Sequence, residues 1–175
     1  YEEEQARMNG FEEIKETWTD KDIILLGDRG HGENSIEMLI EYYNKRQGLI
    51  IHTLFIENIN YNNGINYAEE VNINTLPVNR RYIFNKLREF CTYIIGLETR
   101  DSLEIPYEKR CNACLKVWPE VIKQHFNPGN LNIACVGTAH LVKVIEKDEK
   151  EEDITVEPLS HGISTYLNIP IDKIS

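Results

Sequence analysis

Two short stretches of this sequence place histidine, carboxylate and glycine directly after a run of apolar residues. LLGDRGHGE, residues 25–33, contains Asp28 and His31, and IACVGTAHL, residues 133–141, contains His140. Imidazole can act as a general base or can hold a divalent ion that activates water, and a nearby carboxylate can orient it or bind the same ion. The glycines beside these histidines allow tight turns, so the backbone can approach a bound group closely.

Two further carboxylates, Glu57 and Glu98, also follow apolar runs. A single glutamate or histidine in such a position is usually solvated or structural. Ligands of open α/β sheets, however, bind beyond the carboxyl ends of the strands, where several such residues would meet. We therefore predict a shared site that contains His31, Glu57, Glu98 and His140, with Asp28 in support.

Alternating strands and helices must position these residues. Apolar runs predict strands at 22–27, 50–56, 94–98, 131–136 and 154–157. Helical spacing predicts helices at 2–18, from 34 or 35 onward, at 78–93, at 107–126 with a kink at Pro119, and at 141–147. This order predicts an α/β fold with a mostly parallel central sheet covered by helices on both faces.

The 175 residues are enough for a single domain with a substantial core. We expect a leading helix within residues 1–21 and the folded core within 22–170. The chain starts at Tyr1 rather than Met, which suggests a domain excised from a longer chain, whose other domains would then be its partners.

Composition excludes several classes of function. The net charge of −10 and the pI of about 5.0 speak against nucleic acid or an anionic membrane as the main partner. No apolar run approaches the roughly 20 residues of a transmembrane helix. Four cysteines are too few for a disulfide scaffold, which favours a reducing compartment. Cys111 and Cys114 form a CxxC pair, for which buried or half-buried thiols on a helix are favoured over a metal or redox site.

Other polar residues receive more modest interpretations. His52 and His125 are expected to be structural, whereas His161 follows the last predicted strand and is a candidate binding residue. Residues 58–75 are polar and long for a connection, which predicts a lid over the site with Tyr61 or Tyr67 reaching inward. The alternative is a solvated insertion with no role.

Four motifs in order, LLGDRGHG, FIEN, EKRCNACLKVW and CVGTAHL, resemble the superfamily that groups erythromycin esterase, ChaN, TraB and the Tiki proteases. The tail GISTYLNIP is similar to that of some members, including modules of large bacterial toxins. The resemblance implies that Arg110 and Asn112 match an Arg-Asn pair of the family, with Cys111 between them. Asp28 stands where the family usually has glutamate.

This resemblance implies a hydrolase that cleaves an ester or amide in a small-molecule or peptide substrate, with either metal assistance or a histidine base. His31, Glu57 and His140 would hold Mn²⁺, Co²⁺ or Zn²⁺, and Arg110 would bind an anionic or carbonyl group of the substrate. Haem is the alternative cofactor. The alternative function is a non-catalytic module that binds haem or a protein partner within a bacterial toxin or effector. The reducing compartment would be the bacterial cytoplasm, or the host cytosol for a toxin module.

Overall fold

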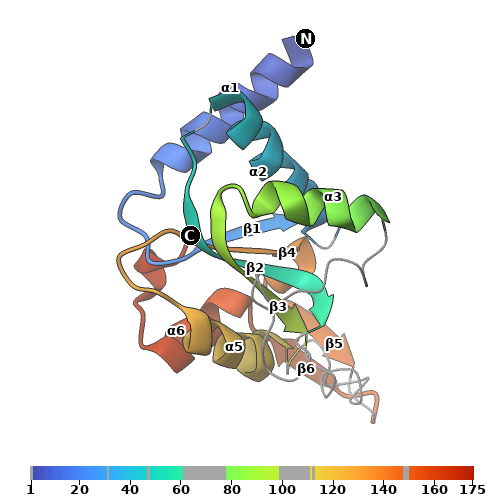
Figure 1. Cartoon of the computed structure of the whole chain (residues 1–175). Helices are drawn as coiled ribbons and strands as arrows, with labels where there is room; N and C mark the ends of the chain where they lie inside the picture. The colour runs from blue at the N-terminus through green and yellow to red at the C-terminus, as the bar shows by residue number, and fades with distance from the viewer. Residues whose placement is uncertain are drawn as a thin grey trace.

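A parallel sheet forms the centre of the molecule (Figure 1). The computed structural model describes residues 2–30, 32–46, 48–60, 78–98, 111, 113–147 and 150–175. Four strands pair in the order β1-β4-β2-β3, and all three pairings are parallel. The strands are β1 (Ile24–Asp28), β2 (Ile51–Asn60), β3 (Cys91–Glu98) and β4 (Asn132–Gly137). The prediction of an α/β fold with a mostly parallel sheet is therefore confirmed.

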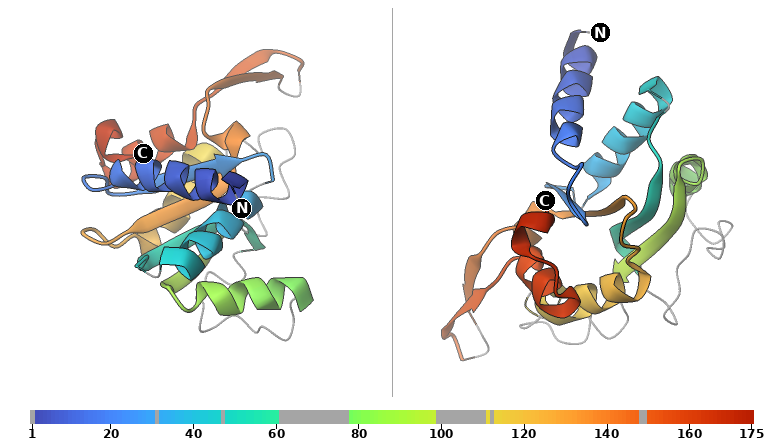
Figure 2. Two further views of the ribbon diagram at one scale, coloured as in Figure 1. Left: turned by 90° about the horizontal axis from the view of Figure 1, so that it is seen from above. Right: turned by 90° about the vertical axis from the view of Figure 1, so that its left-hand side faces the viewer.

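Helices flank the sheet on both faces, as predicted (Figure 2). The helices of one face are α1 (Glu2–Glu16), α2 (Glu33–Arg46) and α3 (Val78–Leu87). On the other face are the π-helical segment η4 (Ala113–Val117), α5 (Trp118–His125) and α6 (Leu159–Leu167). Two buried apolar clusters result, one with Phe11, Leu39 and Phe84, the other with Trp118 and Leu159. Among the described residues, no helix is long and apolar enough to cross a membrane.

Strand β2 shows how the alternation of side chains orients the site. Leu54 and Ile56 belong to the cluster under α1–α3, whereas Phe55 belongs to the cluster under α5 and α6. Because side chains alternate along a strand, Glu57 follows Phe55 onto the second face. Glu57 is buried there, with only 4% of its surface exposed.

The predicted helix at 78–93 is wrong at its carboxyl end. Helix α3 ends at Leu87, and β3 already begins at Cys91, where it pairs with Ile51 of β2. Thr92 and Tyr93 have side chains that favour strands, and pairing with β2 decides in favour of the strand. Strand β2 is also longer than predicted, so Glu57 lies within it instead of after it.

The predicted helix at 141–147 is also wrong. The short 3₁₀-helix η5 (Thr138–His140) follows β4, and the chain then forms the strand β5 (Val144–Lys147). This strand pairs antiparallel with β6 (Asp153–Val156), which confirms the strand predicted at 154–157. Alternating half-buried and exposed side chains along β5 give the period of two that a hairpin needs.

The predicted helix at 107–126 is present from residue 113 to residue 125, and its residues 107–110 and 112 lie outside the described part of the chain. The π-helical turn of η4 gives way to α5 at Trp118, so the proline occupies the first turn, where its missing N–H is tolerated. The tail motif forms α6 and then the short helix η6 (Ile171–Lys173). Beyond it, Ile174 pairs with Ile23 beside β1. The first three residues of the lid predicted at 58–75 belong to strand β2 instead, and the rest of it, with Tyr61 and Tyr67, lies outside the described residues.

Candidate functional site

Glu57 and His140 meet at the carboxyl edge of the sheet. Strands β2 and β4 are neighbours, with Ile56 opposite Cys135, and η5 turns the chain back immediately after β4. As a result, Oε1 of Glu57 lies 3.1 Å from Nε2 of His140. The sequence prediction placed these two residues at one edge, and the structure brings them into hydrogen-bond contact.

The surroundings of Glu57 determine which nitrogen of His140 carries a proton. Besides the contact to His140, Oε2 of Glu57 accepts the backbone N–H of Gly137 at 2.7 Å. An ionised carboxylate can only accept hydrogen bonds, so we assign the proton of a neutral His140 imidazole to Nε2. Nδ1 then presents its lone pair and can accept a proton.

Two residues that the sequence prediction did not place in the site also contact His140. Sγ of Cys114 lies 3.3 Å from Nδ1 of His140, and the Trp118 ring packs at 4.4 Å between centroids and 52° between planes. Cys114 and Trp118 are only 1% and 2% exposed. The indole N–H of Trp118 finds no hydrogen-bond partner among the described residues. The spacing of four residues in CLKVW was the available signal, because it places both side chains on one helical face.

Helix α6 holds η4 against this site through a glycine. A methyl group in place of the Gly162 hydrogen would overlap the carbonyl oxygen of Cys114 and crowd the ring of Pro119. Only glycine therefore permits this close approach of the two backbones. The approach fixes the backbone that carries Cys114.

Asp28 is a loop anchor in this structure. Its Oδ1 accepts the backbone N–H groups of Gly30 and Gly32, and its Oδ2 accepts the N–H and the hydroxyl of Ser35. Burial alone would raise the pKa of Asp28, but the hydrogen bonds from Ser35, Gly32 and Gly30 outweigh it and lower that pKa. Gly32 adopts a positive φ of 91°, and a side chain there would collide with the backbone of Cys135. Asp28 thus organises the turn before α2, and four protein donors already occupy its oxygens.

The structure describes only part of the remaining predicted site residues. His31, Arg110 and Asn112 lie outside the described residues. Glu98 is the last residue of β3 opposite Asn60 of β2, and the position of its side chain is likewise outside the description. His161 lies in the first turn of α6 with an exposed side chain. The pair that the structure brings together is therefore Glu57 and His140.

His52 has the structural role that its sequence context indicated, and the two CxxC thiols are buried or half-buried, as predicted. His52 contacts the hydroxyl of Thr53 at 2.8 Å and the amide of Asn127 at 3.0 Å, which is a structural use. All four cysteines are thiols, with Cys111 half-buried and Cys114 buried. Burial raises the pKa of Cys135, and it raises that of Cys91 as well. Both thiols are therefore held in the protonated form.

The described residues fit a metal ion only in part. They contain no group of three or more histidine, cysteine, aspartate or glutamate side chains that could hold one. Glu57 and His140 offer two donors, whereas a catalytic zinc site uses three protein ligands and a water. The third predicted ligand, His31, is outside the described residues.

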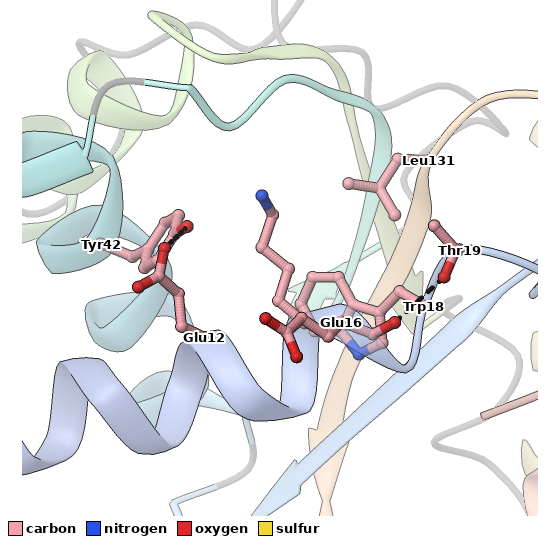
Figure 3. A pocket seen from close by; sticks show the side chains of 7 residues that line it. Glu12, Glu16, Trp18, Thr19, Tyr42 and Leu131 are labelled. Carbon is pink, nitrogen blue, oxygen red and sulfur yellow. Dashed lines mark hydrogen bonds between the residues drawn. The ribbon is translucent and has the colours of Figure 1, made fainter.

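A separate pocket of about 370 Å³ lies between α1 and α2 (Figure 3). Glu12, Trp18 and Tyr42 line it, and Leu131 closes one side. Leu131 precedes β4, whereas Gly137 ends that strand, so the two lie roughly 20 Å apart at 3.3 Å per residue. The pocket is therefore at the amino ends of the strands, whereas Glu57 and His140 meet at the carboxyl ends.

Comparisons with known proteins give no match. No protein-family model matches this chain, and no curated protein or solved structure is significantly similar to it. The functional argument therefore depends on the geometry of the site.

Proposed function

We propose that this domain is a hydrolase that cleaves an ester or amide with His140 as its general base. The observation that carries the proposal is the double anchoring of Glu57. One carboxylate oxygen is fixed by the N–H of Gly137 at 2.7 Å, and the other receives Nε2 of His140 at 3.1 Å. An imidazole whose second nitrogen is oriented by a buried carboxylate is well placed to act as a general base.

The chemistry follows from the assigned tautomer. Nδ1 of His140 takes the proton of the attacking group as that group adds to the carbonyl carbon of the substrate. The carboxylate of Glu57 stabilises the imidazolium that results, because the two groups are in contact and Glu57 is shielded from water. The imidazolium then returns the proton to the leaving alcohol or amine. A positioned base of this kind contributes roughly 10²- to 10⁴-fold to the rate.

The test is turnover of a panel of activated esters and peptide amides by the full chain and by two variants. His140→Gln removes the base and Glu57→Gln removes the orienting charge, and both should reduce turnover to near background. The matched control is His125→Gln, the same substitution at the far end of α5, where His125 is half-buried.

Comparison of turnover among the native chain and the three variants decides the proposal. Turnover that survives in His125→Gln and is lost in the other two variants supports the proposal. Equal turnover in all four proteins, or none in any of them, overturns it, and the second result would favour the non-catalytic binding module. Circular dichroism of each variant checks that the fold is retained.

A further inference from the structure

We propose that Cys114 is the nucleophile of this site, so that acyl transfer proceeds through a thioester on Sγ instead of direct attack by water. This inference rests on the proposed function and adds a covalent step to it. Sγ of Cys114 lies 3.3 Å from Nδ1 of His140, and Nε2 of the same ring contacts Glu57. Nucleophile, base and orienting carboxylate within hydrogen-bond reach form the arrangement that marks covalent catalysis.

The direction of the hydrogen bond supports this assignment. Glu57 keeps the imidazole proton on Nε2, so Nδ1 can only accept, and the thiol of Cys114 is the donor that faces it. The carbonyl oxygen of His140 is a second acceptor, but at 3.9 Å from Sγ it is farther away. The closer acceptor is therefore the basic nitrogen.

Two other cysteines show what burial does to the pKa of a thiol, which Asp28 raises further for Cys135 and Cys135 raises further for Cys91. Cys135 and Cys91 are also buried, and burial keeps both protonated and unreactive. Cys114 is buried to the same degree, at 1% exposure, but it lies against an imidazole. Reagents must reach it by a local opening beside His140, whose side chain is 15% exposed.

His140 transfers one proton in each half of the reaction, first from Sγ to the leaving group and then from water to Sγ. Nδ1 of His140 takes the Sγ proton, and the thiolate adds to the carbonyl carbon. The bond from this carbon to the leaving oxygen or nitrogen breaks, and the leaving group takes the proton from Nδ1. Water then attacks the thioester, giving one proton to Nδ1, and this proton returns to Sγ as the thiol leaves. No oxidant or reductant takes part.

Alkylation with iodoacetamide tests the proposal without any substrate. The reagent forms an S–C bond and releases iodide, and mass spectrometry of peptides gives the rate at each cysteine of the folded chain. We expect Cys114 to be alkylated about tenfold or more faster than Cys135, which serves as the control within the same molecule. In His140→Gln the advantage of Cys114 should disappear. Labelling of Cys135 in that variant would reveal unfolding, and Glu57→Gln then serves as the second variant.

The proposal is overturned if Cys114 reacts as slowly as Cys135 in the native protein, or if its rate is unchanged in His140→Gln and Glu57→Gln. A second experiment separates it from the proposed hydrolase function. Incubation with p-nitrophenyl acetate should leave an acetyl group on Cys114 that hydroxylamine removes. Turnover that persists in Cys114→Ser, together with no acetyl group on Cys114 of the native chain, would support the hydrolase and overturn Cys114 as its nucleophile. Rapid alkylation of Cys114 and a lasting acetyl group on it, without turnover of any substrate, would support Cys114 as a nucleophile and overturn the hydrolase.

Discussion

Oε1 of Glu57 and Nε2 of His140 are 3.1 Å apart, although 83 residues separate them in the sequence. The contact exists because β2 and β4 are neighbouring parallel strands and because η5 turns the chain back toward β2. Glu57 is also tied to the end of β4 through Gly137. One carboxylate therefore connects the sheet to the imidazole.

Glu57→Gln should reduce both activity and stability. The amide can offer only one good acceptor to two N–H donors, so either Gly137 or His140 is left facing an NH₂ group. We expect turnover to fall roughly 10²- to 10⁴-fold. The free energy of unfolding in urea should fall by about 1–3 kcal/mol, the cost of an unsatisfied buried group. Glu120→Gln, an exposed substitution on α5, is the matched control and should change neither quantity.

Two helical glycines should respond in opposite ways to alanine. Gly162→Ala places a methyl group into the carbonyl of Cys114, so we expect a loss of about 1–3 kcal/mol in unfolding free energy. Gly10 in α1 has no neighbouring atom within 4 Å of the added carbon. Gly10→Ala should therefore stabilise the protein by about 0.5–1 kcal/mol. Equal effects in both variants would contradict the close packing of α6 on η4.

Asp28 should make the stability depend on pH in the acid range. Its pKa is lowered in the folded state, so its contribution is complete above the unfolded value of about 3.9 and is lost as the pH falls through the folded value. Asp28→Asn should destabilise the protein at pH 7, and its difference from the native chain should shrink below about pH 4. Urea unfolding at several pH values measures this. A constant difference across the range would show that the hydrogen bonds of Asp28 are not responsible.

Two substitutions of Trp118 separate the contribution of its ring to stability from that of its indole N–H. The N–H is buried and has no partner among the described residues, so Trp118→Phe removes an unsatisfied group and keeps an aromatic ring against His140. Trp118→Ala leaves a cavity and should cost about 3–5 kcal/mol, whereas Trp118→Phe should cost much less. Thermal unfolding of the two variants gives the comparison. Similar losses would mean that the indole nitrogen is bonded after all.

Metal chelation distinguishes hydrolysis with His140 as the general base from hydrolysis assisted by a bound metal ion. With His140 as a base engaged by Glu57 and Cys114, we expect EDTA to leave turnover unchanged. Added Mn²⁺ or Co²⁺ should then leave the melting temperature unchanged, because an ion that binds only the folded state would raise it by mass action. Loss of activity in EDTA, restored by one of these ions, would instead support a metal site with His31 as the third ligand.

The sequence predicted the parallel sheet, and it placed Glu57 and His140 at the same edge of it, for physical reasons. Strand β4 is a nearly continuous apolar run and is buried along its whole length, as a central parallel strand covered on both faces must be, and β1 begins with a similar apolar run. Residues 91–93 and 141–147 were wrongly predicted as helical, because the apolar residues of a short segment fit the period of 3.6 of a helix and the period of two of a strand. Their neighbours in space, β2 for one and β6 for the other, decide the outcome.

Part of the site could not be predicted from the sequence. The contact of Glu57 with His140 follows from strand order, which parallel topology makes foreseeable. The contact of Cys114 with His140 depends instead on the phase of the π-helical turn in η4 and on its packing against α6. Both are tertiary effects, so the CxxC spacing alone did not indicate a role for this thiol.

The position of β4 inside the sheet imposes an order on folding during synthesis. Strand β1 pairs with β4 on one side and bonds to residues 174–175 on the other, so both neighbours are translated late. A nascent chain that ends before residue 132 contains the β2–β3 pair but neither neighbour of β1. We expect such a fragment to expose apolar edges and to depend on chaperones, because non-local pairing is slow and prone to aggregation. Glu57 can therefore contact His140 only after residues 132–140 have been translated and β4 has inserted beside β2.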